Sequence, residues 1–258
     1  MIRTSLPHAL RPSPNFEPRK DGFKPSILLM HYTDMKTAAE ACNWLCDPCS
    51  KVSCHYLVDE DGAITQMVDE EMRAWHAGQS SWRGESDINS RSIGIEIQNP
   101  GHRYGYRDFP AAQMRAVIDL SRDIVARNGI NPERVLAHSD VAPGRKVDPG
   151  ERFDWKLLHE AGVGHWVTPA PIGSDAGSKP GDTGAAVERL QAMLASYGYG
   201  LPVTREYDAR TAAVVSAFQL HFRQVRVDGI ADKSTVDTLE RLSARLPRFN
   251  RTNPSPLN

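Results

Sequence analysis

Several residue types that bind metals or move protons lie together in residues 137–150, AHSDVAPGRKVDPG. In chain order they are His138, Asp140, Lys146 and Asp148. The hydrophobic run RVLA predicts a short buried strand, so His138 is expected where that strand leaves a sheet. Pro143 and Gly144 disfavour a helix and turn the backbone, and such a turn can bring Asp148 back towards His138. We infer that these ionisable groups converge on a metal ion.

A second histidine, His31, ends the apolar stretch SILLMHYTDM, which predicts a strand buried on both faces. Catalytic zinc commonly uses three protein ligands and leaves a fourth position for water. His31, His138 and Asp148 would supply two imidazoles and one carboxylate, and the remaining positive charge can bring a bound water to a pKa of about 7. Each residue alone also has a plainer interpretation, a solvated surface group or a core histidine. The set of three favours the metal.

The stretch SIGIEIQN, residues 92–99, predicts another buried strand. Its isoleucines alternate, which leaves Gly94 and Glu96 on the opposite face. A buried carboxylate needs a partner, so Glu96 is interpreted as a general base near the metal, with a solvent-exposed strand face as the alternative. Lys146 would stabilise the oxyanion of a tetrahedral intermediate, with a plain surface lysine as the alternative.

Other patterns predict the elements that must hold these residues. We expect a helix over residues 37–46 in which Trp44 and Leu45 pack inward, and a buried strand that ends at His138. The clearest amphipathic helix is predicted to end before Gly129, and Pro132 follows it closely. The further expected elements are an extended arm over 1–25, a β-hairpin over 55–68, the amphipathic helix over 109–128 and a short helix over 153–162.

Residues 167–181, VTPAPIGSDAGSKPG, predict a linker. The expected division is a catalytic domain over 1–166, the linker, a small helical domain over 182–246 and a disordered tail over 247–258. Two helices of the small domain should begin at Asp208 and Asp232, each with a threonine three residues later. Such a linker implies few contacts between the two domains.

Composition narrows the functional classes. The chain has 258 residues, 40% of them hydrophobic, and a formal net charge of -1, which speaks against nucleic-acid binding. No apolar run approaches the ~20 residues that span a bilayer. The first residues, MIRTSLPHALRPSPNF, lack the apolar core of a signal peptide. We therefore expect the protein in the cytoplasm, and separately we expect it to be a monomer.

Four cysteines lie close together in the sequence, and they are Cys42, Cys46, Cys49 and Cys54. A structural zinc or iron–sulfur site is one interpretation, and a redox or metal-sensing protein would follow from it. The paired CxxC spacing of such sites is missing. We favour reduced thiols that act as small apolar side chains.

Five ordered motifs carry a family resemblance. HYTDM, VSCHYLVDEDG, RAWHAG, NSRSIGIEIQNPG and HSDVAPGRKVDPG resemble the zinc-dependent N-acetylmuramoyl-L-alanine amidases of the AmpD type, which are related to the peptidoglycan recognition proteins and to phage lysozyme-type amidases. The resemblance covers about residues 10–165 and implies an α/β fold, a mixed central sheet flanked by helices, with zinc in a surface groove. It implies that His31, His138 and Asp148 are the ligands, Glu96 the acid/base and Lys146 the oxyanion partner. Some phage relatives carry a catalytic tyrosine where Cys54 stands, which leaves that role to Glu96.

The C-terminal region resembles the three-helix peptidoglycan-binding domain of wall hydrolases, on the motifs GDTGAAVERLQAMLASYGYG, DARTAAVVSAFQ and VDGIADKST. Tyr207 and Ala231 replace glycines often found there. Such a domain implies peptidoglycan as a partner and gives the periplasm or cell envelope as the alternative to the cytoplasm. The implied substrate is peptidoglycan or a soluble muropeptide, including its 1,6-anhydro form. A non-catalytic peptidoglycan-binding protein is the alternative. We expect the groove wall to include Trp75, His76, Asn89 and Ser92.

Overall fold

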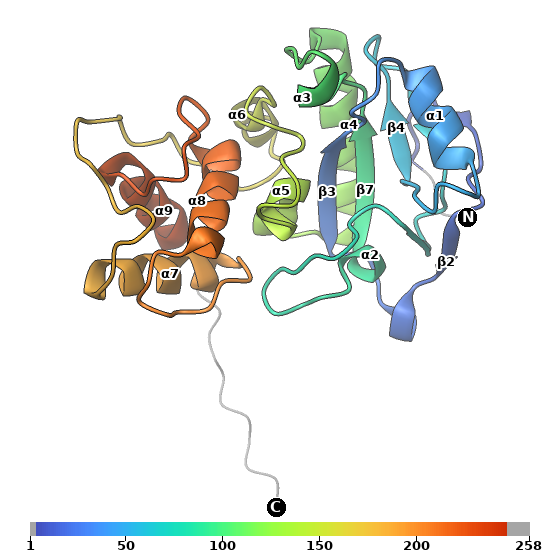
Figure 1. Ribbon diagram of the computed structural model, residues 1–258. Helices are drawn as coiled ribbons and strands as arrows, with labels where there is room; N and C mark the ends of the chain where they lie inside the picture. Colours follow the sequence, from blue (N-terminus) through green and yellow to red (C-terminus); the bar gives the residue numbers. More distant parts are fainter. Residues whose placement is uncertain (1–3, 247–258) are drawn as a thin grey trace, which may run out of the picture.

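The computed structural model describes residues 4–246. A six-stranded sheet lies at its centre, in the order β1-β5-β4-β7-β3-β8, and only the β4–β5 pair is antiparallel. Its strands are β1 (Ala9–Leu10), β3 (Ile27–Tyr32), β4 (Tyr56–Val58), β5 (Ile64–Gln66), β7 (Ser92–Ile97) and β8 (Val135–Ala137). A second, two-stranded sheet pairs β2 (Phe16–Pro18) with β6 (Met72–Ala74). The predicted mixed sheet is confirmed (Figure 1).

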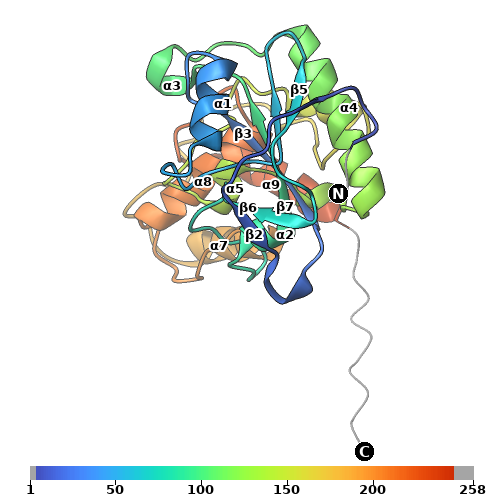
Figure 2. The same ribbon diagram turned by 90° about the vertical axis from the view of Figure 1, so that its right-hand side faces the viewer.

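Helices cover both faces of the central sheet. One face packs on α4 (Ala111–Asn128), whose inward residues include Val117 and Leu120, against Leu28 of β3 and Ile95 of β7. On the other face, α1 (Ala38–Cys46) packs beside β4. Figure 2 shows these two helices on opposite sides of the sheet.

Local chemistry sets the helix ends as the sequence predicts. The hydroxyl of Thr37 accepts from the backbone of Glu40 and caps α1. Helix α4 begins after Pro110 and ends at Gly129, which has a φ of 62°. The predicted hairpin is also present, with Val58 of β4 opposite Ile64 of β5. Three further short helices lie between the N-terminus and the linker, and they are α2 (Ile88–Arg91), α3 (Gly101–Tyr104) and α6 (Trp155–Glu160).

The segment over residues 137–150 departs from the prediction in one respect. His138 begins a four-residue helix, α5 (His138–Val141), instead of ending a strand. Pro143 and Gly144 follow the helix, so they limit its length and do not prevent it. This helix lies between β3 and the C-terminal helices (Figure 1).

The C-terminal region is a bundle of α7 (Ala185–Tyr197), α8 (Ala209–Phe222) and α9 (Lys233–Ala244). Asp208 and Asp232 cap α8 and α9, as predicted, by accepting from the backbone of Thr211 and Thr235. The expected disordered tail, 247–258, lies outside the described residues. Within residues 4–246 no helix is long and apolar enough to cross a membrane.

The bundle does not stand apart from the sheet. One hydrophobic cluster runs from Ile27 and Leu29 of β3, through Trp82 and Val141, to Leu194 and other residues of the bundle. Gly198 lies so close to Trp82 that a Cβ there would be 2.5 Å from the indole ring. The expectation of few contacts across the linker is therefore wrong, because the linker's composition carries no information on what its flanking elements bury.

Candidate metal site and groove

The elements that carry the predicted site residues meet at the carboxyl end of the central strands. His31 lies near the end of β3, directly opposite Glu96 in the parallel register with β7. On the other side of β3, β8 leads into α5 and His138. The carboxyl ends of parallel strands lie at the same end of the sheet, so the strand order alone brings these three residues together.

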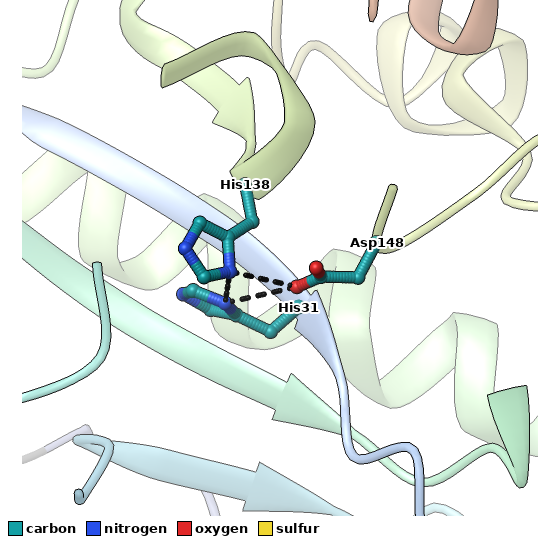
Figure 3. Close-up of side chains that lie close together, drawn as sticks. All are labelled: His31, His138 and Asp148. Atoms are coloured by element: carbon teal, nitrogen blue, oxygen red, sulfur yellow. Dashed lines mark hydrogen bonds and ion pairs between the residues drawn. The ribbon is translucent and has the colours of Figure 1, made fainter. Parts of the chain in front are cut away.

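Asp148 completes a triangle of ligand atoms (Figure 3). The Nδ1 atoms of His31 and His138 are 2.9 Å apart, and Oδ2 of Asp148 lies 3.1 Å and 3.0 Å from them. Zinc ligands in tetrahedral geometry lie about 3.3 Å from one another. All three residues are buried, and they form a group that can hold a metal ion. Two imidazoles and one carboxylate match a catalytic zinc site in number, type and spacing.

The second nitrogen of each histidine has its own partner. With Nδ1 facing the metal position, Nε2–H of His138 donates to the carbonyl of Ala77 at 3.1 Å, and Nε2–H of His31 donates to Nδ1 of His76 at 2.9 Å. His76 Nε2–H then donates to the hydroxyl of Ser92 at 3.2 Å, which donates to the carbonyl of Ile88 at 2.7 Å. Such partners fix the tautomer and orientation of a metal-binding imidazole.

Gly94 makes room for this chain of hydrogen bonds. A Cβ at Gly94 would lie 2.5 Å from Nδ1 of His76, far inside van der Waals contact. The glycine in the middle of β7 is therefore explained by the close approach of the His76 ring.

Burial shapes the protonation of the ligands. It lowers the pKa of His31 to about 4, with the neighbouring His138 adding to the effect. Burial works to raise the pKa of Asp148, but His138 and His31 outweigh it and hold that pKa below its usual range. A neutral imidazole and an ionised carboxylate are the forms that bind metal.

The metal position opens into a groove of about 390 Å³ whose lining includes Glu96 and Lys146. Oε2 of Glu96 is buried and has no hydrogen-bond partner within the described part of the chain. Burial raises the pKa of Glu96 well above its usual value, Asp148 adds to the rise and Lys146 opposes it. A carboxyl with a raised pKa and one unpaired oxygen beside a metal position suits a group that takes up and releases a proton.

The residues predicted for the groove wall separate into two groups. Trp75 lines the groove, and His76 reaches its floor behind His31. Asn89 and Ser92 are buried behind it. The Oδ1 atom of Asn89 accepts from the backbone of His76 and Ala77, at 3.1 Å and 2.8 Å, and the Ser92 hydroxyl is bonded to His76. These two residues hold the RAWHAG segment in position, and the structure does not bring them to the substrate side.

Trp44 was expected to pack inward, but its side chain is 48% exposed and lines the groove. Trp44 lies on the outer face of α1, whereas the neighbouring Leu45 is buried against the protein. Helical periodicity distinguishes the two faces only when one is clearly polar, and neighbouring apolar residues at 44 and 45 leave the choice open.

The cysteines do not gather as metal ligands within the described residues, where the one candidate metal group is His31, His138 and Asp148. Cys54 is fully buried, with its thiol near the carbonyl of Tyr56, and burial raises the pKa of that thiol well above its usual value. His55 is buried too, accepts from the backbone of Gly94 and donates to the carbonyl of Met72. Neither residue belongs to the candidate metal group, and both are buried in the fold.

Two family models match the chain. Residues 21–151 match the family described as N-acetylmuramoyl-L-alanine amidase, and residues 183–239 match the putative peptidoglycan binding domain. The first match contains all three candidate ligands, Glu96 and Lys146.

Several known proteins are similar over most of the chain. N-acetylmuramoyl-L-alanine amidase AmiD of Escherichia coli is 37% identical over 84% of this chain and 81% of its own length. The 1,6-anhydro-N-acetylmuramyl-L-alanine amidase AmpD of Salmonella typhimurium is 34% identical over 56% of this chain and 84% of its own length. The solved complex of E. coli AmiD with anhydro-N-acetylmuramic acid-L-Ala-D-gamma-Glu-L-Lys matches with a TM-score of 0.73 and 36% identity, over 92% of this chain and 93% of that one. AMPDH3 from Pseudomonas aeruginosa matches with a TM-score of 0.71 and 32% identity, over 88% of this chain and 94% of that one.

Proposed function

Because the chain belongs to the N-acetylmuramoyl-L-alanine amidase family, we propose that it cleaves its substrate with a zinc ion held by His31, His138 and Asp148. The reaction is hydrolysis of the amide bond between N-acetylmuramic acid and L-alanine of the stem peptide. Members of the family typically depend on zinc. We propose that the substrates include the 1,6-anhydro form of the sugar, which two similar enzymes bind or are named for.

One observation carries the proposal. Three metal-binding atoms converge within 4.8 Å at the floor of a groove, and Glu96, whose buried Oε2 has no hydrogen-bond partner in the described residues, lines the same groove. A buried carboxyl oxygen without a partner is costly, and a binding protein without activity would have no use for one beside a metal position. The complete set of groups therefore favours the enzyme over a non-catalytic peptidoglycan-binding protein.

The residues of the chain have distinct roles in this proposal. When bound, the zinc ion supplies a Lewis acid that polarises the scissile carbonyl and favours ionisation of water. Glu96 accepts the proton of the attacking water and passes it to the departing amine of L-alanine. Lys146 stabilises the negative charge that develops on the carbonyl oxygen. Trp75 and the exposed face of Trp44 offer apolar surface along the groove to the sugar and peptide.

We propose that the bundle over 182–246 binds peptidoglycan, after the linker over 167–181 and the catalytic region over 1–166. The family match over residues 183–239 supports this. Tyr207 and Ala231 are buried at the positions where glycines are often found, so the changes alter packing inside the bundle. The bundle would bring the groove to insoluble wall, whereas soluble muropeptides can enter the groove without being held on the wall.

The direct test is to incubate the full-length protein with anhydro-N-acetylmuramic acid-L-Ala-D-gamma-Glu-L-Lys and identify the products by mass spectrometry. We expect the free tripeptide and the sugar acid. Removing metal with a chelator should abolish the reaction, and added zinc should restore it while added magnesium should not. Cleavage at another bond, or full activity after metal removal, would contradict the proposal.

A second assay concerns the physical form of the substrate. The same protein should be compared on soluble muropeptide and on intact sacculi, with release of stem peptide as the readout. Strong preference for soluble substrate agrees with the predicted cytoplasmic address, and activity on sacculi agrees with the envelope alternative. Both addresses stay predictions, as does the monomeric state.

A further inference from the structure

A fully buried carboxylate lies two residues after a candidate metal ligand. Asp140, in α5, accepts the backbone N–H of Ala137 at 2.8 Å. It also accepts the Tyr199 hydroxyl at 2.6 Å and the Nδ1–H of His221 at 2.6 Å. Tyr199 and His221 both belong to the C-terminal bundle, so two of the three groups bonded to this carboxylate come from outside the catalytic region.

The two donors are themselves held firmly. His221, in α8, is stacked between Trp155 and Phe222, with ring centroids 3.7 Å and 3.8 Å away. Tyr199, in the turn after α7, packs edge-on against Trp82 at 5.0 Å. Burial and the adjacent carboxylate raise the pKa of Tyr199 well above its usual value, so its hydroxyl stays protonated and donates. Both donors are therefore in fixed positions when they meet Asp140.

The helix that carries Asp140 also determines where two candidate ligands lie. His138 is the first residue of α5, and the N–H of Ser139 donates to the backbone carbonyl of Asp148 at 3.0 Å. A rotation of this one-turn helix would move His138 directly and Asp148 through that hydrogen bond. A four-residue helix is too short to hold its own orientation, so outside contacts must supply it.

We propose that Tyr199 and His221 of the C-terminal bundle are positioning residues for the metal centre, which hold α5 through Asp140 and thereby set His138 and Asp148. The proposal rests on the proposed function, because it takes His31, His138 and Asp148 as the zinc ligands. The bundle would then have two roles, to bind peptidoglycan and to support the active site. Partners behind metal ligands commonly change metal affinity or activity 10- to 100-fold when removed.

The test uses the full-length protein and two conservative variants, alone and together. Tyr199→Phe removes one hydroxyl, and His221→Phe removes the donor while keeping an aromatic ring in the stack. The matched control is Gln224→Ala, because Gln224 donates across the same domain contact at 2.8 Å but to the carbonyl of Phe153, away from α5. Zinc affinity by chelator competition and the visible spectrum of the cobalt-substituted protein are the readouts.

We expect each single variant to bind zinc about 10-fold more weakly and the double variant to lose up to about 100-fold. The cobalt spectrum should change in both variants, and kcat should recover when zinc is in excess. The Gln224→Ala protein should match the wild type in zinc affinity and spectrum. Thermal unfolding of each metal-free protein separates a local change at the site from a general loss of structure.

Unchanged zinc affinity in a folded double variant would overturn the proposal, and so would an equal loss in the Gln224→Ala protein. If the double variant does not fold, Tyr199→Phe alone decides, since it deletes a single oxygen. Failure of the proposed function looks different, because the wild-type protein and its Asp148→Ala variant would then bind zinc equally well.

Discussion

His31 and His138 present the same ring nitrogen to the metal position, but different parts of the chain support the two imidazoles. His31 lies on a central strand, and its partner His76, with Ser92 bonded behind His76, belongs to the same region of the fold. His138 and Asp148 lie on a short helix and the turn after it, whose orientation depends on Asp140 and the bundle. We refer to these as the strand side and the loop side of the site.

The difference shows two ways of obtaining the same precision. On the strand side the sheet's hydrogen bonds fix the backbone, and only the ring needs orienting. On the loop side the backbone itself needs support from a distant part of the chain. Residues on strands are held precisely with few supporting contacts, while residues on loops need additional contacts from other parts of the chain.

The largest effect should come from the ligands themselves. His31→Ala on the strand side, and His138→Ala or Asp148→Ala on the loop side, should each abolish hydrolysis and sharply lower zinc content, because two ligands hold the ion poorly. Zinc stoichiometry by metal analysis and activity on muropeptide are the measurements. Full zinc occupancy in the Asp148→Ala protein would remove the loop side from the ligand set.

The next effect compares the two proposed catalytic groups, one on each side. Glu96→Gln should lower kcat by ~10²–10⁴ with zinc retained, because the amide keeps the shape but cannot take the proton. Lys146→Ala should lower kcat by ~10²–10³, as loss of one oxyanion donor does elsewhere. KM should change little in both cases. A Glu96→Gln enzyme with near-normal kcat would mean that another group moves the proton.

The same pair makes a prediction on pH. Lys146 lowers the pKa of Glu96, so its removal should raise that pKa further. Glu96 then keeps its proton to a higher pH, and the acidic limb of the kcat profile should move to higher pH in Lys146→Ala. Arg152→Ala, at an exposed position outside the groove, is the control. An unshifted limb would show that Lys146 and Glu96 do not act on each other.

The smallest effect concerns the support on the strand side. Gly94→Ala would push the His76 ring away from His31 and should weaken zinc binding about 10-fold, with a smaller change in kcat at saturating zinc. Gly173→Ala makes the same chemical change where the nearest atom is 3.5 Å away, and should bind zinc normally. If both variants bind zinc equally, the strand side needs no orienting partner and the two sides differ more than we infer.

Much of the strand side could be predicted from the sequence, because periodicity and capping are local. The apolar runs around His31 and Glu96 and the amphipathic helix that ends at Gly129 form as expected. The convergence of the candidate ligands also followed from strand ends and a turn. The strands and the helix depend on residues within one or two turns of each other along the chain, whereas the convergence depends on where the strands end in the sheet.

The loop side and the shared core were not predictable in the same way. Nothing near His138 indicates that Asp140 pairs with residues 59 and 81 positions further along the chain. The Pro/Gly-rich linker suggested independence, although Trp82 packs against Tyr199 beyond it. Local patterns tell which face of an element is apolar but not which distant element covers that face.

The continuous core has a consequence for synthesis of the chain. The sheet face that carries Ile27 and Leu29, together with Trp82 and Val141, leaves the ribosome before the bundle that covers it. At roughly 5–20 residues per second, the bundle follows only after several seconds. During that interval the nascent chain would expose an apolar surface, and α5 would lack the contacts that Tyr199 and His221 make with Asp140. Nascent chains stalled after residue 182 should therefore be digested rapidly by added protease and hold zinc poorly, and both defects should disappear once α8 has emerged.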